Sequence, residues 1–350
     1  MNMKSSRPLL KVFSACDPFI VAEIGVNHDG SPALALELVE AAARAGANAV
    51  KFQWFDSLEL LSSSASLVAY QRQSGESDPH EMLSRLQLSS DDMNSLIESA
   101  HRLGLQAMVT VFTPRLVTSA LQLPWDLLKV ASPDLVNRPL LEALRSAGLP
   151  ILMSTGGASL EEVQEALSWI GSENLGLLHC VSSYPTNVED AGLAVIRTLA
   201  EATGVPVGYS DHTRMVETGG IAVAAGATML EKHLTWNTSA KGPDHAASMD
   251  PDGFQAYVEF SRTARTLLGE SKKQIHHSEA DVITASRQSV SVIDEVPQGG
   301  ILQAENLTTM RPGDGIPPAR LNSLVGRRVI RRIAPRSLIS VQDLESETAP

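Results

Sequence analysis

Two lysines stand inside otherwise apolar stretches of this sequence, AVKF at 49–52 and LLKV at 127–130. An ammonium group is costly to bury unless an anion compensates its charge. For Lys51 or Lys129 alone, two interpretations are equally open: a structural ion pair, for example with Glu23, or a place in an active site. As a pair, with hydroxyl side chains at neighbouring strand ends, the two lysines favour a pocket that binds phosphate and carboxylate groups.

Two histidines, His212 and His233, stand at the ends of two consecutive strand-like segments. A single histidine in such a place is more often a hydrogen-bonded structural residue, but two imidazoles can share one divalent metal ion. Three acidic residues nearby in the sequence, Asp134, Asp211 and Glu231, favour the metal site. No third histidine or cysteine belongs to this set, which argues against a structural zinc and for a labile hard or borderline ion that also holds water and a substrate oxygen.

The elements that must position these residues are eight β-rich runs, each followed by an amphipathic helical stretch. Strands are expected at 19–25, 48–53, 105–110, 127–132, 150–155, 175–180, 206–210 and 227–234. Helices are expected between them, for example at 33–45, 91–103, 160–170 and 216–225, and a glycine stands just before the next strand at positions 46, 104, 148, 204 and 226. Eight such units predict a (β/α)₈ TIM barrel, because a doubly wound sheet has fewer strands and a G-x-G-x-x-G turn that is missing here.

Active sites of such barrels lie where the strands end, and the polar residues expected there form a coherent set. They are Glu23, Lys51, Gln53, Thr110, Lys129, Ser132, Ser154, Thr155, His179, Ser182, Ser210, His212 and His233. The segment 62–79, rich in Ser, Gln and Gly, interrupts the second unit on the same side and is a candidate mobile lid. The loop 241–251 combines functional residue types with a good start for a last helix at 254–268.

A change in composition divides the chain into domains. Residues 1–270 form the expected barrel domain, 271–286 a polar and basic linker, and 287–350 a small domain with β-rich runs at 289–293, 328–333 and 338–341. Between Arg287 and Ser340 there are eight arginines and no lysine against four acidic residues, which gives +4 on a chain of net charge −12. We therefore expect this basic module to dock against an acidic barrel.

The composition also limits the classes of function. The 350 residues are 43% hydrophobic and 19% charged, and no apolar run is long enough to span a bilayer. The net charge of −12 disfavours nucleic acid as the main partner. The apolar stretch 9–16 is broken by Lys11 and has no clean cleavage signature, so we expect no secretory signal and place the protein in the cytoplasm. Cys16 and Cys180 fit no metal or redox spacing and are expected to be free thiols.

The motifs, taken in order, resemble those of the sialic acid synthase family. The barrel part carries AEIGVNHDG (22–30), VKFQ (50–53), KVAS (129–132), PL (139–140), STG (154–156), HC (179–180), YP (184–185), GYSDH (208–212), LEKH (230–233) and GPD (242–244). The C-terminal part resembles the antifreeze-like (SAF) domain of that family through LTTMRPGDGI (307–316) and LVGRRV (324–329). No single motif is decisive, but both domains in this sequence order are highly specific.

The resemblance implies a transferase that condenses phosphoenolpyruvate with an N-acylated hexosamine or a related aldose into a nine-carbon keto acid. The catalytic residues it implies are Glu23, Lys51, Lys129, Asp134 and His212. The substrate-binding residues it implies are Lys51, Gln53, Thr110, Lys129, Ser132, Ser154, Ser182, Tyr184, Ser210, Asp244 and Arg311. It also implies manganese or magnesium on His212 and His233, and a domain-swapped homodimer in which Arg311 reaches into the barrel of the other chain.

Two departures from the bacterial pattern concern the sugar. Bacterial members often have Glu where this chain has Asp134, and Asn where it has Ser182; both changes resemble the animal-type synthases. The acceptor therefore stays open between N-acetylmannosamine, mannose, a 6-phosphate of either and a diacetylated bacterial sugar.

Two other functions compete with the synthase interpretation. A Schiff-base aldolase could use Lys51 or Lys129, because a buried lysine with a lowered pKa is a competent nucleophile. A non-catalytic carbohydrate-binding protein could use the SAF-like module alone, but that interpretation leaves the two lysines and the two histidines unexplained.

Overall fold

The computed structural model describes residues 17–346. The chain divides into two compact units after Gly269. The expectations for Cys16 and for the apolar stretch 9–16 concern residues outside the described part of the chain. Within that part, no helix is both long and apolar enough to cross a membrane.

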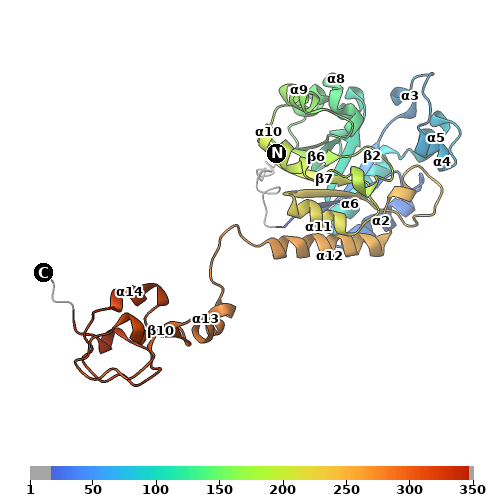
Figure 1. The fold of residues 1–350 in the computed structure, drawn as a ribbon. Coiled ribbons are helices and arrows are strands. Elements are labelled where there is room, and N and C mark those ends of the chain that lie inside the picture. Colours follow the sequence, from blue (N-terminus) through green and yellow to red (C-terminus); the bar gives the residue numbers. More distant parts are fainter. Residues whose placement is uncertain (1–16, 347–350) are drawn as a thin grey trace. The chain divides into compact units, whose positions relative to one another are not determined.

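The first unit is a closed barrel of parallel strands in sequential order, as predicted (Figure 1). Its strands are β1 (Phe19–Gly25), β2 (Ala49–Trp54), β3 (Gln106–Val111), β4 (Leu127–Val130), β5 (Ile151–Ser154), β6 (Leu175–Cys180), β7 (Val207–Asp211) and β8 (Met229–His233). β8 pairs with β1 and closes the ring, with Glu23 opposite His233. Two predicted strands match the observed bounds, and the other six differ from them by one to two residues at an end.

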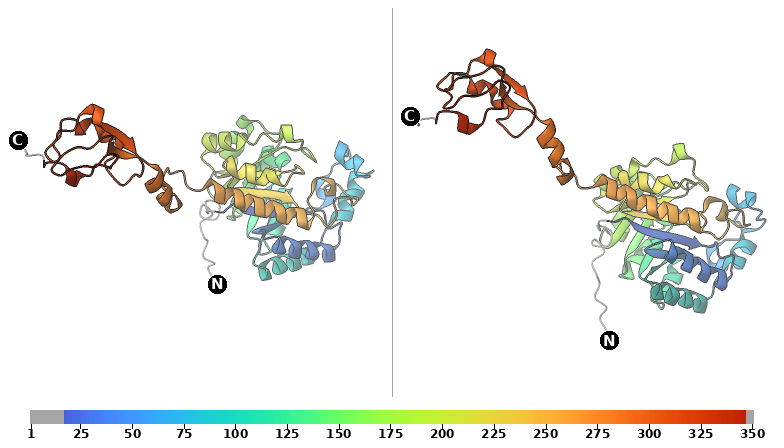
Figure 2. Two further views of the ribbon diagram at one scale, coloured as in Figure 1. Left: turned by 60° about the horizontal axis from the view of Figure 1, so that its bottom comes forward. Right: turned by 90° about the horizontal axis from the view of Figure 1, so that it is seen from below.

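Helices cover the outside of the barrel, and two turned views show them around the sheet (Figure 2). They are α2 (Pro32–Arg44), α6 (Ser90–Arg102), α7 (Pro114–Ala120), α8 (Arg138–Ser146), α9 (Leu160–Ile170), α10 (Val195–Thr203), α11 (Glu217–Ala224) and α12 (Pro251–Leu268). Serine hydroxyls start three of them: Ser31, Ser89 and Ser159 accept the first free backbone N–H groups. The glycines predicted to precede strands have φ between 67° and 110°, the left-handed conformation that ends a helix without a Cβ clash.

Strand alternation places the polar residues at one end of the barrel interior. An apolar cluster fills the interior near the strand starts, formed by Phe19, Val21, Ala49, Met108, Leu127, Leu152, Leu178 and Met229. Successive side chains of a strand point to opposite faces, so the residue two positions further along points inward as well. By this rule Val21 is followed by Glu23, Ala49 by Lys51, and Leu127 by Lys129. The apolar cluster therefore forms the base on which a polar pocket is built.

The segment between β2 and α6 folds into three short helices on the pocket side. They are α3 (Ser57–Leu60), α4 (Ala69–Gln73) and α5 (Pro79–Leu86). A small apolar cluster joins them to the barrel through Val26, Phe55, Leu67, Met82 and Leu86. The predicted lid segment 62–79 contains α4, whose side chains reach the pocket described below; its mobility stays a prediction.

The second unit has its own core and little regular sheet. It contains α13 (Ala280–Ser286), α14 (Leu321–Leu324) and an antiparallel pair, β9 (Ser289–Val292) and β10 (Leu307–Met310). The β-rich runs predicted at 328–333 and 338–341 are wrong as strands: they make only single β-bridges, such as Val296 with Ile333 and Ser291 with Leu338. Residues 280–286, expected within the linker, form α13. The core is Val290, Val292, Val296, Leu302, Leu307, Ile316, Leu324, Val329, Ile333, Ile339 and Leu344.

Candidate active site

A pocket opens at the carboxyl ends of the barrel strands. Its lining includes twelve of the predicted site residues: Glu23, Lys51, Gln53, Thr110, Lys129, Ser132, Ser154, Tyr184, Ser210, His212, His233 and Asp244. Every strand of the barrel or the loop directly after it contributes to this lining. The insertion adds a second wall, formed by Tyr70, Gln71, Met82, Leu83 and Leu86.

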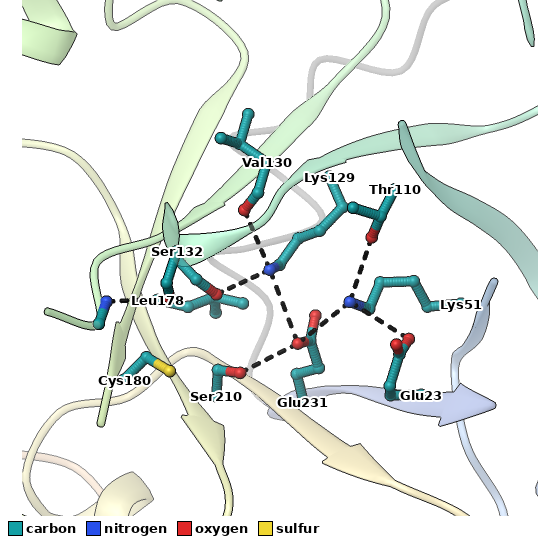
Figure 3. A network of polar contacts seen from close by, with 12 residues as sticks. Glu23, Lys51, Thr110, Lys129, Val130, Ser132, Leu178, Cys180, Ser210 and Glu231 are labelled. Atoms are coloured by element: carbon teal, nitrogen blue, oxygen red, sulfur yellow. Dashed lines mark hydrogen bonds and ion pairs between the residues drawn. The ribbon is translucent and has the colours of Figure 1, made fainter. Parts of the chain in front are cut away.

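Four charged side chains form the floor of the pocket, and we call them the floor cluster: Glu23, Lys51, Lys129 and Glu231 (Figure 3). Lys51 Nζ lies 3.2 Å from Glu23 Oε2 and 3.3 Å from Glu231 Oε1. Glu231 Oε1 also lies 3.7 Å from Lys129 Nζ, so one carboxylate oxygen faces both ammonium groups. All four residues are at most 4% exposed. The structural ion pair and the pocket are therefore both present, and the two interpretations of the lysines do not exclude each other.

Hydroxyl groups surround the lysines of the floor cluster. Lys129 Nζ donates to Ser154 Oγ at 2.7 Å and to the backbone oxygen of Val130 at 3.1 Å. Lys51 Nζ donates to Thr110 Oγ1 at 3.3 Å, and Ser210 Oγ donates to Glu231 Oε1 at 3.0 Å. The partners of the two lysines are therefore neutral oxygens or single carboxylates. An incoming oxyanion can take the place of a hydroxyl as hydrogen-bond acceptor, and the lysine keeps a partner throughout.

Burial and neighbouring charges shift the pKa values of the floor cluster in different directions. Burial lowers the pKa of Lys129 to about 8, against the opposing effect of Glu231. Burial also acts to lower the pKa of Lys51, but the carboxylates of Glu23 and Glu231 outweigh it, and that pKa is raised. Burial raises the pKa of Glu23 despite Lys51. Burial would raise the pKa of Glu231 too, but the two ammonium groups lower it to about 2.

Two imidazoles lie at the side of the floor cluster. The ring centroids of His212 and His233 are 5.4 Å apart. His212 Nδ1 lies 2.8 Å from the backbone oxygen of Val181, so Nδ1 carries a proton that it donates there, and Nε2 is the nitrogen left for a metal ion. Burial, and then the charge of His212, lowers the pKa of His233 well below its usual value, so this ring is neutral at neutral pH.

The two imidazoles fit a metal site that is completed from outside the protein. His233 Nδ1 is buried without a hydrogen-bond partner and lies 3.6 Å from Asp244 Oδ2. A neutral imidazole with a free nitrogen is the form that binds a divalent metal. Across residues 17–346, no group of three His, Cys, Asp or Glu side chains is placed to enclose an ion. Water and substrate would therefore have to supply the remaining ligands.

Aromatic and carboxylate groups line the outer part of the pocket. The centroid of the Tyr184 ring lies 4.0 Å from that of the tilted His212 ring and 5.0 Å from that of Tyr70, which comes from α4 and stacks on Tyr184. Burial raises the pKa of the Asp244 carboxyl, with His212 opposing it. Gln53 Nε2 donates to Glu23 Oε1 at 2.9 Å. This part of the pocket offers donors and acceptors at different depths, as a polyhydroxylated ligand requires.

Two residues expected at strand ends, Thr155 and His179, do not line the pocket, and neither do three residues that the resemblance implies for the site. Ser182 is nevertheless close to it: a Cβ on Gly156 would lie 2.4 Å from Ser182 Oγ and 2.9 Å from Ser132 Oγ. Asp134 lies on the short 3₁₀ turn 132–136, where Asn137 Nδ2 donates to its Oδ1 at 3.4 Å. Arg311 belongs to the second unit, so its approach to a pocket stays a prediction.

Four of the pocket residues with polar or ionisable side chains were not among the predicted site residues: Glu231, Cys180, Tyr70 and Gln71. The sequence carried a signal for Glu231, which lies two positions before His233 in the strand MLEKH and was noted as an acidic residue near the predicted metal site. Cys180 is a buried free thiol whose Sγ lies 3.8 Å from His212 Nδ1. The side chains of α4 carry no local signal, because only the packing of the insertion brings them to the pocket.

Each of the two units matches a known protein family or domain. Residues 38–273 match the NeuB family, and residues 287–345 match the SAF domain. The chain belongs to the NeuB family. The first unit therefore carries the family match, and the resemblance noted from the motifs is confirmed.

Several relatives of this NeuB-family chain are named as synthases. It is 36% identical to the N,N′-diacetyllegionaminic acid synthase of Legionella pneumophila, over 94% of this chain and 95% of that protein. It is 33% identical to the synthase of the same name from Campylobacter jejuni, over 88% and 94%. The crystal structure of N-acetylneuraminic acid (sialic acid) synthetase from Leptospira borgpetersenii, in complex with citrate, superimposes with a TM-score of 0.70 at 33% identity and covers 76% of this chain and 90% of that one. The chain is accordingly an enzyme of the nonulosonic acid synthase family.

Proposed function

We propose that this enzyme condenses phosphoenolpyruvate with an open-chain, N-acylated aldose to give a nine-carbon keto acid and inorganic phosphate. The observation that carries the proposal is the floor cluster, which sets two ammonium groups around one carboxylate beneath a ring of hydroxyls. Phosphoenolpyruvate bears a phosphate and a carboxylate on adjacent groups, and paired lysines with hydroxyl donors match that charge pattern. A neutral sugar alone would not need such a floor.

In this proposal the barrel side chains divide between the two substrates. Lys51, Lys129 and three serines, Ser132, Ser154 and Ser210, hold phosphoenolpyruvate, and Thr110 and Ser182 support the same end of the pocket. Glu23, Gln53, Tyr184 and Asp244 face the sugar, and the family resemblance assigns Asp134 to the sugar as well. Glycine at position 156 lets the backbone come close to Ser132, because a Cβ there would lie 2.9 Å from Ser132 Oγ, which accepts a hydrogen bond of 3.0 Å from Gly156 N.

His212 and His233 would hold Mn²⁺ or Mg²⁺. When bound, such an ion polarises a carbonyl oxygen as a Lewis acid. The protein contributes the orientation of both rings: the hydrogen bond to Val181 sets the tautomer of His212, and Asp244 lies beside His233 Nδ1.

The reaction forms a carbon–carbon bond and a bond between C2 and the oxygen of water, and it breaks the bond between C2 and the phosphate oxygen. C3 of phosphoenolpyruvate attacks the aldehyde carbon of the sugar, whose oxygen takes up a proton. Water adds to the cationic C2 and loses one proton. The tetrahedral centre then collapses: the C2–O bond to phosphate breaks, the hydroxyl proton passes to the departing phosphate, and the ketone remains. Lys51 and Lys129 stabilise the negative charge on the phosphate as it departs, in a site where burial strengthens the interaction.

The dimer and the cellular location are parts of the same proposal. We infer that two chains exchange their SAF domains, so that Arg311 of one chain completes the pocket of the other. The excess of arginine in the C-terminal part of an acidic chain supports this arrangement. The enzyme would act in the cytoplasm, where phosphoenolpyruvate is made.

A phosphate-release assay with a panel of sugars tests the proposed reaction. We expect phosphate from phosphoenolpyruvate only when an aldose is present, and product masses that equal the aldose plus a three-carbon keto acid unit. The panel contains N-acetylmannosamine, mannose, their 6-phosphates and a diacetylated bacterial hexose. Each sugar is tested with chelator-treated protein before and after addition of Mn²⁺ or Mg²⁺. Phosphate release that is independent of any sugar, or full activity of verified metal-free protein, would contradict the proposal.

The lowered pKa of Lys129 predicts a pH limit on the use of phosphoenolpyruvate. Below about pH 8 the side chain is an ammonium that binds the anion, and above it the neutral amine binds weakly. We therefore expect kcat/KM for phosphoenolpyruvate, which reports the free enzyme, to fall as pH rises past about 8. In Lys129→Arg the charge persists to high pH, so the decline at pH 8 should disappear. A decline with the same midpoint in this variant would assign it to another group.

The same pKa keeps a second function in consideration. An amine with a pKa of about 8 is partly neutral at neutral pH and can form a Schiff base with a keto acid. Borohydride with pyruvate separates the two functions: a covalent adduct on Lys129 would favour the aldolase, and phosphate release without an adduct favours the synthase.

A further inference from the structure

A buried ion pair lies on the outer side of the barrel wall, opposite the pocket. Asp211 ends β7 and Lys232 lies in β8, and both are 0% exposed. Strand alternation turns their neighbours Glu231 and His233 into the pocket and turns Lys232 outward, beneath α11 and α12. Neither member of the pair lines the pocket, and the proposed reaction uses neither of them.

The pair joins the ends of the two strands that carry the histidines. Asp211 and Lys232 are direct partners in the register of β7 and β8. Lys232 Nζ lies 3.4 Å from Asp211 Oδ1 and 5.7 Å from the ring centre of Tyr257 on α12. The surroundings are tightly packed, because a Cβ on Gly219 of α11 would lie 2.5 Å from Tyr257. Neither charged group reaches solvent, since Asp211 and Lys232 are both 0% exposed.

The pair also holds the backbone directly after His212. Asp211 Oδ1 accepts a hydrogen bond of 2.8 Å from the backbone N–H of Thr213. Lys232 Nζ donates to the backbone oxygen of the same threonine. The Thr213 hydroxyl lies 2.9 Å from the Thr218 hydroxyl on α11. One ion pair thus fixes both peptide groups of the residue after His212, and one of its members directly precedes His233.

Stability alone is a poor explanation for this arrangement. A buried ion pair commonly contributes no more than a well-packed apolar pair of similar volume. Its distinctive property is directional, since charged hydrogen bonds hold a backbone at a defined angle. Side chains behind metal ligands commonly orient those ligands in this way.

We infer that Asp211 and Lys232 are positioning residues that set the distance and orientation of His212 and His233 for a divalent metal ion. The inference rests on the proposed function, because it assumes that these two histidines bind the metal. It adds to that function a part of the chain that lies behind the pocket wall and touches no substrate.

Binding of Mn²⁺ to metal-free protein tests the inference without measuring catalysis. The main variant is the double substitution Asp211→Val with Lys232→Met, which removes both charges together and leaves no unpaired charge in the core. Free Mn²⁺ is followed by electron paramagnetic resonance during titration. We expect the double variant to bind Mn²⁺ about 10–100-fold more weakly than the wild type, the usual effect of losing outer partners of metal ligands. KM for phosphoenolpyruvate should change little, because the floor cluster is untouched.

Matched variants separate positioning from general damage. Arg262→Met removes a charged side chain of α12, the helix whose Tyr257 packs on Lys232. Arg262 donates to the backbone oxygen of Gly46 at 2.6 Å, away from the pair, so its loss should leave Mn²⁺ affinity unchanged. Thr218→Val removes only the hydroxyl partner of Thr213 and should weaken Mn²⁺ binding several-fold. If the double variant does not fold, Thr218→Val decides the question, and wild-type affinity in that variant would overturn the inference.

Failure of the inference and failure of the proposed metal site give different results. If wild-type protein does not bind Mn²⁺, or if His212→Ala binds it as well as wild type, the proposed metal site is wrong. If wild-type protein binds Mn²⁺ through the histidines and the folded double variant binds it equally well, the metal site stands and the positioning role is wrong.

Discussion

Replacing Glu231 by glutamine is expected to lower the free energy of unfolding by about 3–5 kcal/mol, the usual cost of leaving a buried charge without its partner. Glu231 is the shared carboxylate of the floor cluster, 3.3 Å from Lys51 Nζ and 3.7 Å from Lys129 Nζ. Its pKa of about 2, against the raising effect of burial, reflects the strength of those two contacts. Glutamine keeps the volume and the hydrogen bond to Ser210 but removes the charge that both ammonium groups face.

Urea unfolding followed by tryptophan fluorescence measures this effect on the barrel alone. The four tryptophans of the chain lie between residues 54 and 236, so the second unit contributes no signal. Glu40→Gln is the matched control, because its ion pair with Arg44 is exposed and should be worth less than about 1 kcal/mol. A change below about 1 kcal/mol in Glu231→Gln as well would mean that the floor cluster tolerates an unpaired lysine.

Most of the barrel follows from local patterns in the sequence. The strands were predictable because each is short and rich in apolar residues, and because five of them follow a glycine that ends the preceding helix in the left-handed conformation, as Gly46 and Gly226 do. The runs at 328–333 and 338–341 have a similar composition and form no strands. They pair only at single positions around a small core. The composition of a run does not show whether the fold provides a neighbouring strand for it to pair with.

The candidate site was predictable where the chemistry is visible within one strand. A lysine in an apolar run, as at Lys51 and Lys129, indicates a buried charge whatever its partner is. The identity of the partner depends on the closure of the barrel: Glu231 on β8 contacts lysines on β2 and β4, and no local spacing encodes that meeting. Tyr70 is harder still, because it reaches Tyr184 only after the insertion has folded on the barrel.

The largest loss of activity is expected on replacing Lys129 by methionine. If Lys129 binds the phosphate of phosphoenolpyruvate and stabilises it as it departs, removing the ammonium should lower kcat/KM for this substrate by about 10²–10³-fold, the range found when one donor to a developing negative charge is lost. Methionine preserves the apolar part of the side chain. The assay measures phosphate release over a range of phosphoenolpyruvate concentrations at saturating aldose.

The partners of the two lysines predict different outcomes for the same substitution. Lys129 is held by Ser154, by a backbone oxygen and by one distant carboxylate, so Lys129→Met should lose activity with a smaller loss of stability. Lys51 lies between Glu23 and Glu231, so Lys51→Met leaves two carboxylates facing each other. This variant should lose both activity and stability. Ser154→Ala, which removes only the 2.7 Å hydrogen bond to Lys129, should lower kcat/KM by about tenfold at most. If Lys129→Met kept its kcat/KM for phosphoenolpyruvate while Lys51→Met lost it, Lys51 alone would bind the anion and Lys129 would serve to hold Glu231 in place.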